Sequence, residues 1–176
     1  MPEGPPETER YTDWVSQRSM EKGPHSRTAR FERAAKAISI AILRNRALEE
    51  GGSGLPVLVE GKRDEATLRA LGFTGKVERV NRGWDRPRLV AYLHSSYCTV
   101  SDGGPSLILL MDWDRTGGRL QTAIRDRLMA LDSPVDEDLR RELLKSMKPE
   151  GRTVESLLSH ADSLEPLVRG FLHDLG

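Results

Sequence analysis

The sequence has little of what several common protein classes require. Its one cysteine, Cys98, permits no internal disulfide and leaves a zinc site without thiolate partners. No apolar run approaches the roughly 20 residues that span a bilayer, and the polar, proline-rich start MPEGPPETER does not fit a secretory signal. We therefore expect a globular protein without a membrane role, and a cytoplasmic location as the default.

Net charge is also absent, because 27 Lys and Arg are balanced by 27 Asp and Glu. Only an uneven distribution of basic and acidic residues along the chain can therefore indicate nucleic-acid binding. Residues 17–46 hold eight bases against two acids and residues 62–88 hold eight against four, whereas residues 132–176 hold six against ten. The N-terminal half could follow a nucleic-acid backbone. Charged helix faces are often only solvated, so both interpretations stay open.

The apolar residues that are present alternate between strand-like runs and helical periodicity. Residues 28–50 have helical spacing and end at the GGSG of 51–54. Three strand, turn and helix units follow, with strands in LPVLV, KVERV and SLILLM, and a weaker strand is expected around 132–136. This order predicts an α/β fold with a parallel sheet of about four strands, flanked by helices on both faces.

Four parts of the chain are expected from these patterns. They are a flexible N-terminal arm over 1–27, a helix with a Gly-rich linker over 28–54, an α/β domain over 55–135 and a C-terminal helical extension over 136–176. Within the extension, the spacing of Leu139, Leu143 and Met147 predicts a helix. Residues 153–176 should form one or two further helices broken before Pro166, because the residue before a proline disfavours the helical conformation.

Acidic side chains follow two of the predicted strands. Glu60 comes after the first strand, and Asp112 and Asp114 come after the third. The carboxyl ends of parallel strands share one edge of a sheet, so neighbouring strands would bring the three carboxylates together. Such a cluster is costly without a cation, and its oxygen ligands suit Mg²⁺ or Mn²⁺.

Asp112 and Asp114 are two residues apart, so on an extended segment they point the same way and could share an ion. Gly117 and Gly118 leave out side chains where a phosphate would approach the start of the next helix. A competing interpretation makes Asp114 the N-cap of that helix, and Glu60 an ordinary solvated strand end.

Two tryptophans lie near these acids in the sequence. Trp84 follows the second strand and could stack on an unpaired base between Arg82 and Arg86, or it could fold back onto the core. Trp113 lies between the two aspartates, and alternation predicts that it points the other way, into packing.

The segments VEGKRDE at 59–65 and MDWDRTGG at 111–118 resemble the Toprim domain. Topoisomerases, bacterial-type primases, small ribosomal-RNA maturation nucleases and related stand-alone proteins share this domain. Its pattern is Glu-Gly after the first strand and D-x-D-x-x-G after the third, and the resemblance covers roughly residues 55–135.

Within that family, the motif EGK-x-D is similar to the corresponding motif of ribonuclease M5-like and small stand-alone Toprim proteins. D-x-D-R-x-G, with Arg115, also resembles the primase version. Topoisomerases tend to carry a third acid where this chain has Thr116, and they need large additional domains with a nucleophilic tyrosine.

The resemblance implies a Mg²⁺-dependent reaction at a phosphodiester. Asp112 and Asp114 would hold the ion together with Glu60, which would also act as general acid or base with a pKa raised by the aspartates. Lys62 and Arg115 would contact phosphate, or would be solvated turn charges. The expected phosphate or nucleic-acid contacts are Gly61, Lys62, Arg82, Trp84, Arg115, Gly117 and Gly118.

The sequence thus predicts a nuclease-like enzyme that processes RNA or DNA. One alternative is a non-catalytic, metal-dependent module that binds nucleic acid or a nucleotide within a larger complex. A primase-like accessory protein is a third, weaker option, because the chain lacks the zinc-binding and polymerase segments of such an enzyme. No motif distinguishes RNA from DNA, since 2′-OH readout depends on individual contacts.

Overall fold

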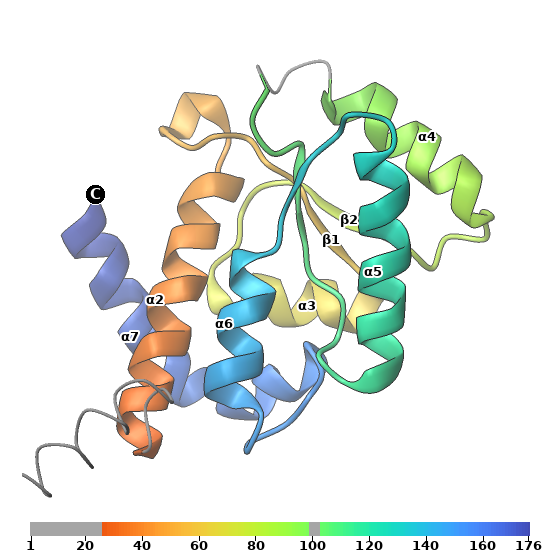
Figure 1. Cartoon of the computed structure of the whole chain (residues 1–176). Coiled ribbons are helices and arrows are strands. Elements are labelled where there is room, and N and C mark those ends of the chain that lie inside the picture. The colour runs from red at the N-terminus through yellow and green to blue at the C-terminus, as the bar shows by residue number, and fades with distance from the viewer. Residues whose placement is uncertain (1–25, 99–102) are drawn as a thin grey trace, which may run out of the picture.

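Four short parallel strands form the centre of the molecule, in the order β2-β1-β3-β4 (Figure 1). This computed structural model describes residues 26–98 and 103–176. The strands are β1 (Val57–Val59), β2 (Val77–Arg79), β3 (Leu107–Leu109) and β4 (Val135–Asp136). In the register of the sheet, Val57 pairs with both Val77 and Ile108, and Leu107 pairs with Val135.

Helices connect these strands and cover both faces of the sheet. They are α2 (Arg27–Asn45), α3 (Lys62–Leu71), α4 (Arg86–Tyr97), α5 (Arg115–Met129), α6 (Asp138–Met147) and α7 (Ala161–Leu175), with short 3₁₀ helices η1 (Leu48–Glu50) and η3 (Glu155–His160). The predicted α/β class, with a four-stranded parallel sheet and helices on both faces, is confirmed. None of the described helices is long and apolar enough to cross a membrane.

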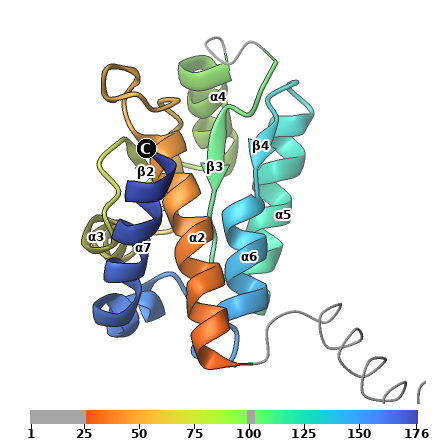
Figure 2. The same cartoon turned by 90° about the vertical axis from the view of Figure 1, so that its left-hand side faces the viewer.

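Alternation along the strands divides the buried side chains into two cores. In β1, Val57 and Val59 pack toward α2, α3, α6 and α7, whereas Leu58 packs toward α4 and α5. Figure 2 shows α7, α2 and α6 side by side in front of the sheet. Because both faces are covered, the strands are apolar at every position of β1 and β3, as in other parallel sheets.

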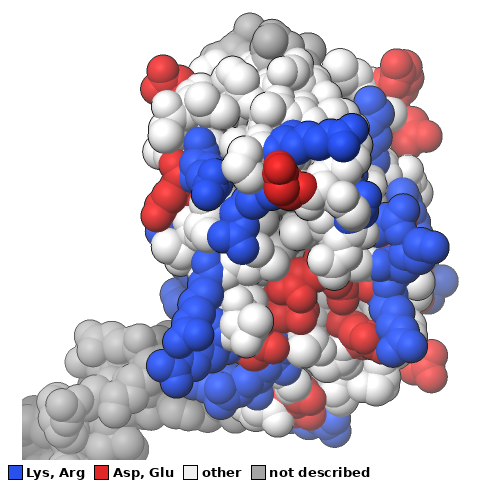
Figure 3. Space-filling view, turned by 90° about the vertical axis from the view of Figure 1, so that its right-hand side faces the viewer, with Lys and Arg blue, Asp and Glu red and all other residues white. Residues whose placement is uncertain are grey.

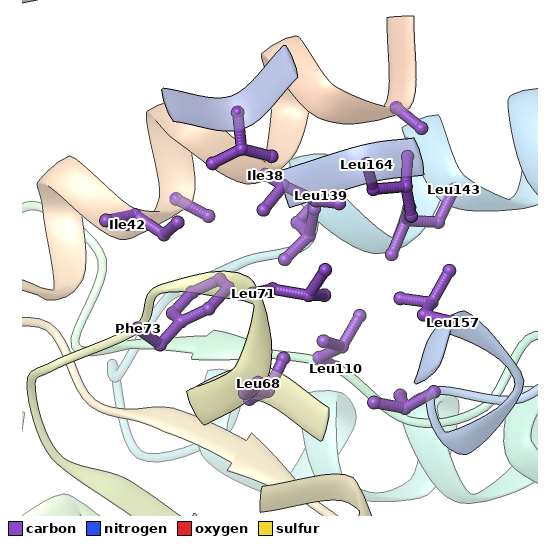
Figure 4. Packing of buried hydrophobic residues seen from close by; sticks show 14 of the residues in the cluster. Ile38, Ile42, Leu68, Leu71, Phe73, Leu110, Leu139, Leu143, Leu157 and Leu164 are labelled. Atoms are coloured by element: carbon purple, nitrogen blue, oxygen red, sulfur yellow. The ribbon is translucent and has the colours of Figure 1, made fainter. Parts of the chain in front are cut away.

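The larger core joins segments that lie far apart in the sequence. Figure 4 shows Ile38 of α2, Leu71 of α3, Leu143 of α6 and Leu164 of α7 converging on one cluster. The helices before and after the α/β segment therefore share one buried cluster with the sheet. The arm predicted over 1–27 lies, up to residue 25, outside the described residues.

The prediction that the first helix reaches residue 50 is wrong, because α2 ends at Asn45. The buried side chain of Asn45 donates hydrogen bonds to the carbonyl oxygens of Leu55 (2.8 Å) and Lys76 (2.9 Å) and accepts one from the N–H of Gly75 (2.8 Å). These bonds hold together the segments that lead into β1 and β2, and they require the chain to leave the helix there.

The predicted break before Pro166 is also wrong, because α7 continues through this proline. The change of helix type occurs earlier, between His160 of η3 and Ala161. Leu164 and Val168 lie on either side of Pro166 and are both buried in the larger core. Packing of this apolar face outweighs the loss of one helical hydrogen bond.

Candidate functional site

The acids singled out by their spacing meet at the carboxyl edge of the sheet. β1 and β3 are parallel neighbours, and the pairing continues past β3 with a hydrogen bond from the N–H of Leu110 to the carbonyl oxygen of Leu58 (2.9 Å). Glu60 therefore leaves one strand next to the point where Asp112 and Asp114 leave the other. Their charges act on one another, as the pKa of Glu60 shows.

Glu60 is half-buried, and its pKa is raised to about 7. Burial is the largest cause, followed by the negative charges of Asp112 and Asp64, a side-chain hydrogen bond with Asp112, and the charge of Asp114. The pKa is raised as expected, and burial is the largest single cause beside the contributions of the aspartates. A carboxyl group with this pKa can exchange a proton near neutral pH.

Asp112 is oriented by a segment that follows it by more than forty residues. Its Oδ1 accepts a hydrogen bond from the backbone N–H of Val154 (2.8 Å). Burial raises the pKa of Asp112, the bond from Val154 opposes this rise, and the charge of Asp114 adds to it. Trp113 is buried, as alternation predicted, and its Nε1 donates to the carbonyl oxygen of Gly151 (2.8 Å).

Asp114 has the capping role that the sequence left open. It is the N-cap of α5, and its Oδ1 accepts a hydrogen bond from the N–H of Gly117 (2.7 Å). Capping involves only one of the two carboxylate oxygens. The two interpretations of Asp114 are therefore compatible, because the other oxygen can still meet a ligand.

Two further acids join the cluster without having been selected from the sequence. Asp64 is buried, and its Oδ2 accepts a hydrogen bond from the N–H of Gly61 (3.0 Å) at the start of α3. Burial raises the pKa of Asp64, the bond from Gly61 opposes this, and the charges of Asp112 and Glu155 add to the rise. Asp64 belongs to the EGK-x-D pattern, so its spacing could have indicated it; nothing in the sequence indicates Glu155.

The glycines of the two motifs differ in whether the surrounding structure would tolerate a side chain at their positions. A Cβ on Gly117 would overlap the carbonyl group of Asp112. This glycine therefore lets α5 approach the turn that carries Asp112 and Asp114, called the acidic turn below. A Cβ on Gly118 would lie 3.5 Å from Nη2 of Arg140, in ordinary contact. A Cβ on Gly61 would meet its nearest neighbour, Nδ2 of Asn81, only at 3.9 Å. Neither contacts nor backbone geometry requires a glycine at 61, whose φ is −151°.

Arg140 of α6 is a further site residue that the motifs do not include. Its half-buried guanidinium donates to the carbonyl oxygens of Met111 (3.2 Å) and Asp112 (2.9 Å). Burial lowers the pKa of Arg140, while the charges of nearby acids, among them Asp114 and Glu60, act in the opposite direction. Arg140 thus holds the turn that carries the aspartates and places a positive charge beside them.

Lys62 and Arg115 are exposed at the first positions of α3 and α5, directly after Gly61 and Asp114. Neither forms an ion pair with any described residue within 4.0 Å. Both side chains thus extend from the edge of the sheet that carries the acids. Their role in phosphate contact stays a prediction.

The turn after β2 places Trp84 against α4. Its ring packs on Tyr92 edge to face, with ring centroids 5.3 Å apart, and the guanidinium groups of Arg82 and Arg88 lie 5.0 Å and 4.3 Å from its centroid. Arg88, rather than the Arg86 considered from the sequence, is thus the second arginine beside the ring. Trp84 is partly buried against the smaller core, which favours the packing interpretation.

The basic residues of α2 are largely matched by the acids of the C-terminal part. Arg33 pairs with Glu142, and Arg44 pairs with Asp136. Other pairs join Arg27 and Arg30 to Glu150 and Arg44 to Asp138. The excess of bases between residues 17 and 46 therefore does not give α2 a free positive face. On another side of the molecule, the one with α4 and α5, Figure 3 shows acidic side chains gathered between bands of basic ones.

The donors at the acidic edge are of the type that binds Mg²⁺ or Mn²⁺. They are carboxylate oxygens, and the raised pKa values of Glu60 and Asp64 both have the charge of Asp112 among their causes. Within the described residues, no three His, Cys, Asp or Glu side chains are arranged to hold a metal ion by themselves. Mg²⁺ is commonly bound through one or two carboxylates, with water and substrate phosphate as the other ligands. The donor set therefore fits such an ion.

Comparisons with known proteins extend over most of the described chain. The chain is 34% identical over 108 residues to a UPF0292 protein of Pyrococcus furiosus, covering 61% of this chain and 75% of that protein. It is 33% identical over 120 residues to a UPF0292 protein of Thermococcus gammatolerans, covering 65% and 83%. A UPF0292 protein of Methanosarcina barkeri is 28% identical over 120 residues, covering 66% and 76%.

No family model matches the chain. Among solved structures, a putative protein from Aquifex aeolicus has a TM-score of 0.49 and 24% sequence identity, covering 66% of this chain and 93% of that one.

Proposed function

Because the chain belongs to the UPF0292 family, a name that states no activity, we propose a function from its own site. The protein is a Toprim-like, Mg²⁺-dependent protein that acts on nucleic-acid phosphodiesters, as a nuclease-like enzyme of RNA or DNA processing. We also propose a cytoplasmic location, since a chain with one cysteine needs no oxidising compartment.

One observation carries this proposal. Glu60 and Asp112 come from neighbouring parallel strands and approach closely enough to share a hydrogen bond, and the charge of Asp112 raises the pKa of Glu60. A carboxyl group whose ionisation is opposed by burial and by its neighbours, as that of Glu60 is, is an unfavourable arrangement for stability alone. Their cost is explained if a cation and a phosphate belong at the same edge.

The proposed roles divide among the acids. Glu60 is assigned the proton exchange of the reaction, since its carboxyl group lies beside Asp112 and has, in the metal-free protein, a pKa raised to about 7. Asp112 and Asp114 would hold Mg²⁺ or Mn²⁺, with Glu60 beside them and with water and substrate phosphate as the remaining ligands. When bound, the ion would offset charge on the phosphate oxygens and lower the pKa of a water molecule.

Groups of the chain itself would bind and orient the phosphate. Lys62 and Arg115 are the exposed first residues of α3 and α5, directly after Gly61 and Asp114, and would supply positive charge. Gly61 leaves space beside Asn81 for close approach. Val154 and Arg140 keep the turn of Asp112 in place through hydrogen bonds to its carboxylate and its carbonyl oxygen.

Metal-dependent cleavage of a panel of single-stranded and structured RNA and DNA tests the proposal. The wild-type protein should cleave at least one substrate with Mg²⁺, lose this activity in EDTA, and recover it when Mg²⁺ is restored. Asp112→Asn should abolish cleavage. Asp126→Asn is the matched control, because Asp126 is exposed on α5 and its only ion pair among described residues is with its neighbour Arg125.

Robust cleavage by Asp112→Asn would refute the proposed site. Mg²⁺-dependent binding of nucleic acid by the wild type, without turnover on any substrate, would instead favour the non-catalytic binding module. In that case Glu60→Gln should bind as tightly as the wild type.

A further inference from the structure

The turn after β2 continues the edge of the sheet that carries the acidic site. The backbone N–H of Asn81 donates to the carbonyl oxygen of Glu60 (2.9 Å), and Nδ2 of Asn81 lies 3.9 Å from the position a Cβ on Gly61 would take. A ligand that occupies the space beside Gly61 therefore borders this turn. Three residues further on, the turn presents Trp84.

Trp84 is not an open platform for a nucleobase. The guanidinium groups of Arg88 and Arg82 lie over its ring, at 4.3 Å and 5.0 Å from the centroid, and the edge of Tyr92 packs against it. A base could stack there only by displacing one of these partners. The ring acts instead on the arginines, because cation–π contact restricts where a guanidinium can go.

The two arginines differ in the donors that they have available. Arg82 donates from Nη2 to the carboxylate of Glu78 and from Nε to the carbonyl oxygen of Arg79. Arg88 is exposed, and its guanidinium makes no hydrogen bond or ion pair with any described residue. Arg88 is therefore a positive charge with its donors available, held in place by its cation–π contact with Trp84.

A guanidinium held in this way is well suited to a phosphate. Its planar N–H groups match two phosphate oxygens, and cation–π contact with an aromatic ring uses none of these donors in a hydrogen bond. Holding the side chain in advance also reduces the entropy lost when the phosphate binds.

We propose that Arg88, supported by Trp84, binds a second phosphate of the nucleic-acid strand that reacts at Glu60, Asp112 and Asp114. This inference rests on the proposed function and specifies its substrate as a single polynucleotide strand rather than a mononucleotide. Asn81 and Trp84 are three residues apart, so their Cα atoms lie within about 11 Å.

The test is fluorescence anisotropy with the full chain and a labelled pyrimidine 20-mer, as RNA and as DNA, in EDTA so that no metal-dependent cleavage occurs. Arg88→Gln should lower the slope of log K against log salt by about 0.7, the contribution of one phosphate contact to a single strand. If counterion release is its only contribution, affinity at 50 mM salt should fall about eightfold.

Arg127→Gln is the matched control. Arg127 is an exposed arginine near the end of α5, far along that helix from the acidic edge, and it pairs with no described acid. Its replacement should change neither slope nor affinity. Equal effects of Arg88→Gln and Arg127→Gln, or no binding of either 20-mer, would overturn the proposal.

Trp84→Leu distinguishes two roles of the Trp84 ring, which either supports Arg88 or stacks on a base of the nucleic acid. If Trp84 only supports the arginine, this variant should bind more weakly with an unchanged salt slope, and no more weakly than Arg88→Gln. A larger loss than in Arg88→Gln would mean that the ring itself stacks on a base, and would overturn the assignment.

Failure of this inference can be told apart from failure of the proposed function. Wild-type binding by Arg88→Gln, together with cleavage that is lost in Asp112→Asn, would reject the second phosphate site and retain the nuclease-like activity. A lowered salt slope in Arg88→Gln, with no turnover in any metal, would retain the strand-binding site and reject the activity.

Discussion

The backbone N–H of Val154 donates a 2.8 Å hydrogen bond to Oδ1 of Asp112, across 42 residues of sequence. The neighbouring residues reinforce this connection, because Trp113 donates from its backbone N–H to the carbonyl oxygen of Arg152 (2.8 Å) and from Nε1 to that of Gly151 (2.8 Å). The segment at 151–154 thus holds the turn of Asp112 and Trp113 through three hydrogen bonds.

Trp113→Phe tests how much this connection contributes. The variant loses the indole N–H and part of the buried ring, and leaves the carbonyl oxygen of Gly151 without its partner. We expect the free energy of unfolding in urea to fall by about 1 to 3 kcal/mol. Mg²⁺ affinity, measured by calorimetry, should fall roughly tenfold because Asp112 is less well oriented.

Trp84→Phe is the control for this change, since the indole N–H of Trp84 donates to no described residue. It should lower stability by less than about 1 kcal/mol and leave Mg²⁺ affinity unchanged. Equal effects of the two variants on Mg²⁺ binding would contradict a role of the 151–154 segment in orienting Asp112.

Alanine at Gly117 should lower the stability of the protein, whereas alanine at Gly61 should leave it almost unchanged. Gly117→Ala places a methyl group on the carbonyl of Asp112, and we expect it to cost about 2 to 3 kcal/mol of stability. Gly61→Ala meets no atom closer than 3.9 Å and should change stability by less than about 0.5 kcal/mol. Thermal unfolding measures both changes.

Gly61→Ala also reports on the ligand. If a phosphate approaches Gly61, the folded variant should lose most of its cleavage activity because its methyl group occupies that space. Full activity in Gly61→Ala would show that no substrate group comes close to this position.

Glu78 should make stability depend on pH in the acid range. Burial alone would raise its pKa, but hydrogen bonds from Tyr97, Arg82 and Tyr92 outweigh burial and lower it. A lowered folded pKa means that the stabilisation is present in full above the ordinary pKa of 4.5 and is lost as pH falls through the folded value.

Glu78→Gln should therefore reduce the free energy of unfolding by about 1 kcal/mol at pH 7, and by much less near pH 3. Denaturant titrations at the two pH values measure the difference. Glu49→Gln, at an exposed position of η1 without an ion pair to any described residue, should show no such pH dependence. A constant effect of Glu78→Gln across this range would contradict the lowered pKa.

Arg140 and Arg141 are adjacent on α6 and should differ sharply in their contributions. Arg140→Gln leaves two carbonyl oxygens of the acidic turn without their donor, so we expect a loss of about 2 kcal/mol in chemical denaturation. Arg141→Gln removes an exposed pair with Asp138 and should cost less than about 0.5 kcal/mol. Similar losses for both variants would mean that Arg140 does not support the turn.

Replacing Lys62 and replacing Arg33 should have different effects, because we expect Lys62 to contact nucleic acid and Arg33 to serve an ion pair within the protein. Lys62→Gln removes a charge beside the acids and should lower the salt slope for single-stranded binding by about 0.7. Arg33→Gln breaks the pair with Glu142 between α2 and α6, so it should lower stability by less than about 1 kcal/mol and leave binding unchanged. A reduced salt slope in Arg33→Gln would restore α2 as a nucleic-acid surface.

Local patterns in the sequence determined most of the framework. Apolar runs and helical spacing predicted the parallel sheet with its helices, because burial on both faces leaves such periodicities in neighbouring residues. The order of strands and turns also predicted that Glu60 lies at the same edge of the sheet as Asp112 and Asp114. Even the inward direction of Trp113 followed from alternation alone.

Local patterns failed where distant segments decide the outcome. The end of α2 depends on Asn45 reaching the segments before β1 and β2, and the continuity of α7 through Pro166 depends on its buried face. The spacing of apolar residues near Asn45 and Pro166 does not predict either contact.

Only the tertiary structure determined what surrounds the acids and which bases remain available. Arg140 and Val154 reach Asp112 because α6 and the 151–154 segment pack beside the sheet. The same packing pairs the arginines of α2 with acids a hundred residues away, and leaves Arg88 exposed on Trp84. Spacing along the chain predicts which residues share a strand or a helix face, whereas partners from distant elements are set by how those elements pack.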